Sequence, residues 1–101
     1  MVKHIVLWRL KDFAEGADKA SNAGKIKVAL EALQGRIPGL VSIEVGVDFE
    51  RSAAAYDVAL YSAFESREAL AAYQVHPEHK QVAEFILRVR SERAVVDYET
   101  P

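Results

Sequence analysis

The chain has 101 residues, of which 50% are hydrophobic and 28% are charged, and its formal net charge at pH 7 is −2. These values are typical of one globular domain over residues 1–101 and exclude a largely disordered chain. The sequence holds no cysteine, which excludes disulfide scaffolds, thiolate metal sites and cysteine-ligated iron–sulfur clusters. The 13 Lys and Arg are scattered among 15 Asp and Glu, so we expect no nucleic-acid-binding surface.

No apolar run approaches the roughly 18 residues of a membrane span, so we expect no membrane association. The first residues enter a strand-like pattern at once, without the apolar core and cleavage site of a signal peptide. A cytoplasmic location is therefore the default expectation.

The first predicted element is a strand over residues 2–11, which are rich in branched and aromatic side chains. Apolar residues fall on both of its faces, because Ile5 and Leu7 point away from the other apolar side chains. This pattern predicts a strand that is buried on both sides. Residues 12–17 are predicted to form a loop.

A helix is predicted over residues 18–35, because its apolar residues recur at helical spacing. The apolar stripe consists of Ile26, Leu30, Leu33 and Ile37. Gly35 suits the end of a helix, and the following Pro38-Gly39 pair prevents any continuation. Gly24 inside the helix costs about 1 kcal/mol relative to alanine.

Residues 40–49 alternate between apolar and polar side chains, which predicts a strand with one buried face. The face expected to be buried consists of Val41, Ile43, Val45, Val47 and Phe49. Residues 50–55 are predicted to form a loop, and residues 56–64 the returning strand of a hairpin.

Two helices and a last strand complete the predicted elements. Ser66 is the expected N-cap of a short helix that turns Leu70 and Tyr73 inward. Pro77 opens a second helix, at the position where its missing N–H costs nothing. The apolar residues of this second helix are Val82, Phe85, Ile86 and Val89. Residues 93–98 form the last strand.

The order β-α-β-β-α-α-β predicts an α+β, ferredoxin-like fold. Its pattern is β-α-β-β-α-β with a split second helix and a four-stranded antiparallel sheet. The helices cover one face of such a sheet and leave Ile5 and Leu7 open to water on the other face. A homodimer that packs sheet against sheet is the simplest cover for this face.

Five segments, taken together and in order, are distinctive. They are residues 2–7 (VKHIVL), 56–60 (YDVAL), 64–66 (FES), 73–79 (YQVHPEH) and 95–98 (VVDY). They resemble the stress-responsive dimeric α/β-barrel (Dabb) domain family over almost the whole chain, and the Tyr-x-x-His-Pro-x-His motif is the most specific part. The resemblance implies a ferredoxin-like protomer and a homodimer whose two sheets form a dimeric α/β barrel.

The resemblance also implies a candidate catalytic site. In one relative, a plant polyketide cyclase (olivetolic acid cyclase), a pocket between sheet and helices closes a ring by an intramolecular aldol reaction without metal or cofactor. The catalytic histidine of that relative matches His79, its partner tyrosine matches Tyr73, and its first-strand histidine matches His4. In this chain His79 lies one turn before Val82, on the inward stripe of its helix, where apolar neighbours keep an imidazole neutral and basic.

The expected pocket differs from that of the cyclase in its walls. Val58 stands where the relative has a histidine, and the first helix carries no aromatic residue at the matching positions. The side chains expected to bind a ligand are Val6, Trp8, Ile26, Leu30, Val58, Leu60, Val82 and Ile86. Such walls suit a small apolar or aromatic molecule.

Three functions remain open at this level. The first is binding of such a molecule, and the second is a cofactor-free cyclase, lyase or isomerase in which His79 and Tyr73 remove a proton next to a carbonyl. The third is a structural stress protein without chemistry, in which His76 caps a helix and His79 is held by a neighbour. No metal or cofactor is expected, because the pair formed by His76 and His79 is interrupted by Pro77 and lacks the spacing of a His-Glu-x-x-His site.

Overall fold

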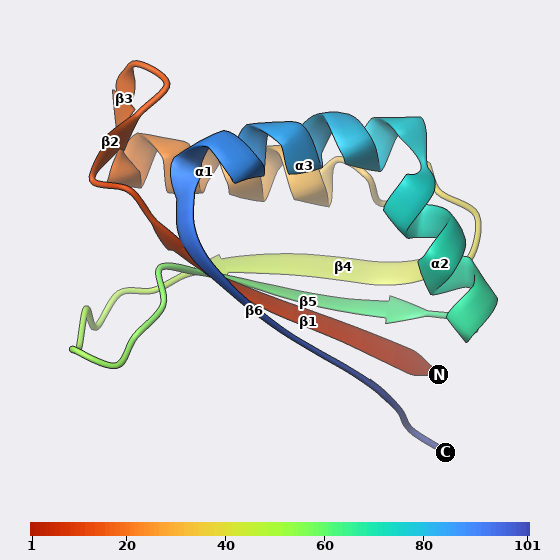
Figure 1. Cartoon of the computed structure of the whole chain (residues 1–101). Helices are drawn as coiled ribbons and strands as arrows, with labels where there is room; N and C mark the ends of the chain where they lie inside the picture. The colour runs from red at the N-terminus through yellow and green to blue at the C-terminus, as the bar shows by residue number, and fades with distance from the viewer.

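The computed structural model, which describes all of residues 1–101, contains a four-stranded antiparallel sheet in the order β4-β5-β1-β6, with the helices on one face (Figure 1). Its elements are β1 (Val2–Leu10), β2 (Phe13–Ala14), β3 (Ala17–Asp18), α1 (Lys19–Glu31), β4 (Leu40–Val47), β5 (Val58–Phe64), α2 (Arg67–Val75), α3 (Pro77–Val89) and β6 (Arg90–Glu99). The second helix of the pattern is split into α2 and α3. This arrangement confirms the ferredoxin-like α+β fold.

The inner face of the sheet, which we define as the face toward the helices, is set by alternation along β1. Val2, His4, Val6, Trp8 and Leu10 are buried, whereas the residues between them are only half-buried. Successive side chains of a strand point to opposite faces, and the helices cover only one of them. Burial of β1 on both sides therefore requires a cover from outside this chain.

The opposite, outer face carries an apolar strip, which we define as Ile5, Leu7, Tyr61, Val96 and Tyr98. Ile5 pairs in register with Tyr61 on β5 and with Val96 on β6, so these side chains lie side by side. Tyr61, Val96 and Tyr98 are 41%, 53% and 43% exposed. The outer-face strip is thus a continuous apolar surface that no element of the chain covers.

The buried face of β4 is shorter than its alternating sequence predicts. Val45 is buried, but Val41 and Val47 are 42% and 44% exposed, and Phe49 lies beyond the strand with 88% exposure. The register with β5 shifts between Leu40 and Ser42, which buries Leu40 and turns the following residue outward. The prediction of one buried face from Val41 to Phe49 was therefore wrong at three of its five positions.

Helix α1 begins where the sequence predicts and ends earlier. The side chain of Asp18 caps it by accepting the N–H of Ser21 at 2.8 Å. The last regular residue is Glu31, and turns lead on to Gly35, which has a φ of +80°. The predicted loop at residues 12–17 contains the short β2–β3 hairpin.

Both ends of the chain lie at the same end of the sheet (Figure 1). Val2 at the start of β1 pairs with Glu99 at the end of β6. The amino group of Met1 donates to the carbonyl oxygen of Thr100 at 3.1 Å, and the N–H of Thr100 donates back to the carbonyl oxygen of Met1 at 2.9 Å. The last strand is therefore held along the whole length of the first.

Candidate functional site

The structure brings His4, Tyr73 and His79 together between the helices and the inner face of the sheet. The ring centroids of Tyr73 and His79 are 4.1 Å apart, and those of His4 and Tyr73 are 6.2 Å apart. Phe64 completes the cluster, with its ring centroid 4.9 Å from that of Tyr73. Residues from β1, β5, α2 and α3 thus meet in one cluster of four rings.

The break between α2 and α3 positions two of these rings. His76 ends α2 and caps α3, because its Nδ1 accepts the N–H of Glu78 at 3.2 Å. Pro77 occupies the first turn of α3, where no N–H is needed. The change of direction at this junction brings His79, in the first turn of α3, next to Tyr73 in the last turn of α2. The capping role of His76, one of the predicted alternatives, is thus present in the structure.

Two polar atoms of the cluster are buried without a hydrogen-bond partner. They are the hydroxyl oxygen of Tyr73 and the Nδ1 atom of His79. Buried polar groups are nearly always paired in proteins, and leaving one unpaired costs about 1–3 kcal/mol. Two such atoms on adjacent rings indicate a position where a polar group of a bound molecule would be held.

Burial also sets the protonation of the two side chains. It raises the pKa of the Tyr73 hydroxyl, which keeps the phenol protonated and able to donate a hydrogen bond. Burial lowers the pKa of His79. Hydrogen bonding to the backbone of Gln74 favours the charged form and partly opposes this effect. Electrostatic interactions with His4, Arg93 and His76 lower the pKa further. At neutral pH His79 is therefore a neutral imidazole that can accept a proton.

Asp97 belongs to this cluster, and the sequence reasoning missed it. It lies opposite His4 in the β1–β6 register, and its Oδ1 is 2.5 Å from the Nδ1 of His4. A carboxylate at Nδ1 fixes the imidazole in the tautomer that carries its proton there and leaves Nε2 as an acceptor. The signal that could have found it is the pairing of β6 with β1, which places Asp97 opposite His4 and Val95 opposite Val6.

The predicted ligand-binding residues are close-packed in the structure. Seven of them belong to the single hydrophobic core, and Val82 packs against it partly buried; the seven are Val6, Trp8, Ile26, Leu30, Val58, Leu60 and Ile86. Of these, Val58 also lines a surface hollow on the outer side, with Leu7 and Ala59. The structure therefore brings these side chains together as a core and does not arrange them around an open cavity.

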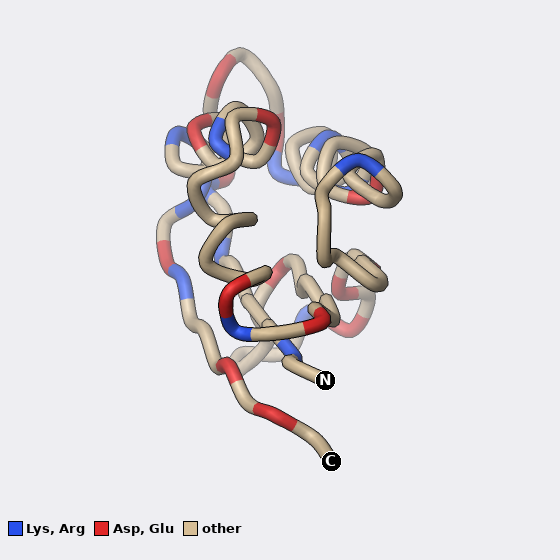
Figure 2. Tube along the Cα trace, turned by 90° about the vertical axis from the view of Figure 1, so that its right-hand side faces the viewer, with Lys and Arg blue, Asp and Glu red and all other residues tan.

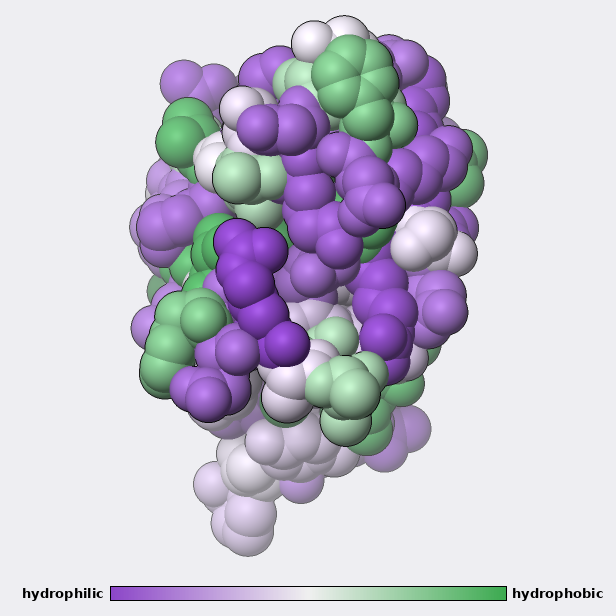
Figure 3. All heavy atoms as spheres, turned by 90° about the vertical axis from the view of Figure 1, so that its left-hand side faces the viewer, coloured by the Kyte–Doolittle hydropathy of each residue, from purple (hydrophilic) through white to green (hydrophobic).

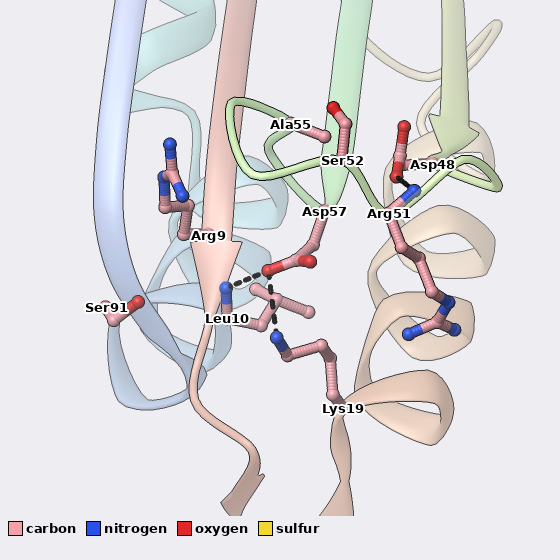
Figure 4. Close-up of a pocket in the computed structure, with 9 residues that line it drawn as sticks. All are labelled: Arg9, Leu10, Lys19, Asp48, Arg51, Ser52, Ala55, Asp57 and Ser91. Atoms are coloured by element: carbon pink, nitrogen blue, oxygen red, sulfur yellow. Dashed lines mark hydrogen bonds and ion pairs between the residues drawn. The ribbon is translucent and has the colours of Figure 1, made fainter.

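A polar hollow of about 360 Å³ lies at the opposite end of β1 (Figure 4). Asp57 stands at its centre, where it accepts the N–H of Leu10 at 2.7 Å and lies 3.5 Å from the Nζ of Lys19. Arg9 and Arg51 point away from Asp57 on either side (Figure 4). The carboxylate thus anchors the loop after β4 to the end of β1 and the start of α1, and the cations around it do not converge on one point.

This end of the molecule is largely hydrophilic at its surface, with isolated apolar patches (Figure 3). One of the exposed apolar side chains in this region is Phe13 on the β2–β3 hairpin. No group of three or more His, Asp or Glu side chains is placed to hold a metal ion. None of the helices has the length and apolar character needed to cross a membrane.

The sequence model of the stress responsive A/B barrel domain, Dabb, matches residues 2–100. The chain belongs to this family. An uncharacterized protein of Streptomyces coelicolor is 32% identical to the chain over 99 residues, or 98% of this chain and 99% of that protein. The predicted family membership is therefore confirmed.

Solved structures share the Dabb fold of this chain. A dimeric protein of ferredoxin-like fold from Bacteroides fragilis is 35% identical, with a TM-score of 0.87, and the match covers 98% of this chain and 95% of that one. A dimeric ferredoxin-like protein from Thermobifida fusca is 26% identical, with a TM-score of 0.84 and coverage of 98% and 90%. A hydroxynitrile lyase from Passiflora edulis, at 21% identity and a TM-score of 0.78 over 96% and 90% of the two chains, shares the fold.

Proposed function

We propose that this Dabb domain binds a small apolar or aromatic carbonyl compound between the sheet and the α2–α3 junction, and that His79 removes a proton from the carbon next to the carbonyl. The observation that carries this proposal is the pair of buried, unpartnered polar atoms on Tyr73 and His79. The phenol has a hydrogen to donate, and the neutral imidazole has a lone pair to accept a proton. A carbonyl oxygen and the adjacent C–H group supply the two complementary partners.

The proposed step needs no redox partner. The C–H bond breaks, its proton moves to Nδ1 of His79, and its electron pair becomes the enolate π bond while the carbonyl oxygen gains negative charge. The Tyr73 hydroxyl stabilises that oxygen by a hydrogen bond. The enolate then attacks a second carbonyl in a ring closure, or takes back a proton at another carbon in an isomerisation.

Exchange of carbon-bound protons tests the proposal without knowledge of the natural substrate. Acetophenone is incubated with the protein in D₂O, and loss of its methyl proton signal is followed by NMR. We expect the wild-type protein to accelerate exchange over buffer and His79→Ala to lower the rate by roughly 10²–10⁴-fold, the usual contribution of a general base. Tyr73→Phe removes one donor to the oxyanion and lowers the rate by up to about 10²–10³-fold.

His76→Asn is the matched control, because asparagine also caps a helix and His76 lies outside the pair. It is expected to exchange acetophenone at the wild-type rate. If the wild-type protein exchanges acetophenone no faster than buffer, or if His79→Ala matches the wild type, His79 is not the base. Acetophenone binding without exchange then favours the ligand-binding function over catalysis.

We also propose that the chain is a homodimer that packs sheet against sheet through the outer-face strip. β5 and β6 contribute exposed apolar side chains to this strip, β1 adds half-buried ones, and the relative from Bacteroides fragilis is described as dimeric. A stable interface buries at least about 1,000 Å². Light scattering at micromolar concentration should give twice the mass of one chain, and Val96→Asp within the strip should shift the mass toward that of one chain; a wild-type monomer refutes the proposal.

A further inference from the structure

A hollow of about 350 Å³ lies at the end of the molecule where α2 begins and β6 ends. Its walls are Val2, Arg67, Leu70, Asp97, Tyr98 and Glu99. Figure 2 looks onto this end and shows both chain termini below α2. The hollow thus lies at the end of β6, and one of its walls, Tyr98, is also the last residue of the outer-face strip.

Three wall residues are direct neighbours of the proposed site. Asp97 carries the carboxylate that holds Nδ1 of His4 at 2.5 Å. Val2 lies two residues before His4 on the same face of β1. Leu70 lies one turn before Tyr73 on the buried side of α2. Asp97, through its bond to His4, thus connects the walls of the hollow to the cluster of buried rings.

An ion pair links the two elements that border the hollow. The Nε of Arg67, the first residue of α2, donates to a carboxylate oxygen of Glu99, the last residue of β6, at 2.6 Å. Both side chains are largely exposed. An exposed ion pair of this kind stabilises a protein by about 0–1 kcal/mol, so thermal motion opens it readily.

The charges of the walls are already paired. Arg67 is the one cation among the wall residues and is bound to Glu99, and Asp97 is bound to His4. The remaining walls are the side chains of Val2 and Leu70 and the ring of Tyr98. While the ion pair is closed, no cation of the walls is free to receive a carboxylate or a phosphate.

From this arrangement we infer that the hollow between α2 and β6 is the entrance through which an uncharged aldehyde or ketone reaches Tyr73 and His79. The Arg67–Glu99 ion pair, which we call the latch, holds the two elements at this entrance together. The inference rests on the proposed function, because it names the substrate class and the route for that same site.

Acylation by diethyl pyrocarbonate tests the entrance directly, because this small uncharged reagent modifies neutral imidazoles. Mass spectrometry of peptides gives a separate rate for each histidine. His4 and His79 report on the route, and His76, at the helix junction, is the internal reference. Arg67→Ala removes the ion pair and is expected to raise the acylation rate at His4 several-fold relative to that at His76. Glu99→Trp places a large side chain in the hollow and is expected to lower the acylation rate at His4.

Arg88→Ala is the matched control. Its guanidinium makes a solvent-exposed ion pair with Glu15, 2.7 Å away, at another place on the surface. This variant should leave the His4 rate unchanged. If Arg67→Ala and Glu99→Trp both leave the ratio of the acylation rates at His4 and His76 unchanged, the hollow is not the entrance. The same conclusion follows if Arg88→Ala raises this ratio as much as Arg67→Ala does.

Protection from acylation tests the substrate class. Acetophenone should slow the modification of His4 and His79, whereas benzoate, of similar size and negatively charged, should not at the same concentration. Protection by benzoate alone, or by neither compound, overturns the assignment to uncharged carbonyl compounds. These readouts require no turnover, so an entrance confirmed by acylation stands even when the exchange of acetophenone protons fails.

Discussion

The imidazole of His79 lies over the ring of Tyr73 with 4.1 Å between centroids and 38° between planes, although the two residues belong to different helices. Each ring carries a buried polar atom with no partner in the protein. Two unpartnered polar atoms lower the free energy of unfolding, but they are available to bind a ligand. A substitution that removes one of them should therefore raise stability and lower activity.

Tyr73→Phe should therefore stabilise the protein while it lowers acetophenone exchange. Removing an unpaired buried hydroxyl relieves a penalty of about 1 kcal/mol or more, and the ring keeps its packing. Urea unfolding monitored by circular dichroism measures the change. Tyr56→Phe, at a half-buried tyrosine outside the cluster, is the control and should change the unfolding free energy little; a loss of stability in Tyr73→Phe would show that its hydroxyl is satisfied in solution.

The stability of the protein should depend on pH through His79. Folding lowers the pKa of His79 below its ordinary value of 6.5, so the unfolded chain binds more protons at this group than the folded one in the window below 6.5. The unfolding free energy therefore rises as pH rises through this window, and the contribution of His79 is constant above it. The slope from this group is at most about 1.4 kcal/mol per pH unit.

His79→Gln tests this dependence, because glutamine does not titrate. Urea midpoints between pH 5 and 7.5 should show a flatter rise in the variant than in the wild type. Above pH 7.5 the two curves should run parallel. Equal slopes below pH 6.5 would contradict the lowered pKa of His79.

Asp97 should control the tautomer of His4. In the wild type the Nδ1 of His4 donates to the carboxylate, so ¹⁵N NMR should find the proton on Nδ1 and a lone pair on Nε2. Asp97→Asn weakens that preference and removes a charge-assisted hydrogen bond, with an expected loss of about 1–3 kcal/mol in stability. A wild-type His4 with its proton on Nε2 would refute the role given to Asp97.

Two glycines should respond oppositely to alanine. Gly39 has a φ of +82°, and a Cβ there would lie 2.5 Å from the Cβ of Ala69 on α2. The left-handed conformation alone costs about 1–2 kcal/mol for an L-residue, so Gly39→Ala should destabilise by at least that amount. Gly24 lies inside α1 with open space around it, and Gly24→Ala should stabilise by about 1 kcal/mol. Thermal unfolding of the two variants checks both signs.

Local chemistry made most of the fold predictable. Ser66 caps α2 by accepting the N–H of Ala69, and Pro77 opens α3, as their side chains dictate. The buried face of β4 was not predictable, because a register shift between Leu40 and Ser42 depends on how two strands meet and leaves no mark in the alternation of one strand.

The candidate site was predictable only in part. The resemblance of the Tyr-x-x-His-Pro-x-His segment to the Dabb family indicated Tyr73 and His79, and the inward stripes of the two helices agreed with it. Asp97 required the pairing of β6 with β1, which joins residues at opposite ends of the sequence. The packing of the expected ligand walls into a closed core depends on side-chain volumes across all layers, which periodicity does not report.

The pairing of the first strand with the last has a consequence for synthesis on the ribosome. β1 is made first, yet one of its two edges stays open until β6, at residues 90–99, has left the exit tunnel. During that interval the nascent chain displays an unpaired edge on a central strand of its sheet, which is the kind of surface that recruits chaperones or neighbouring nascent chains.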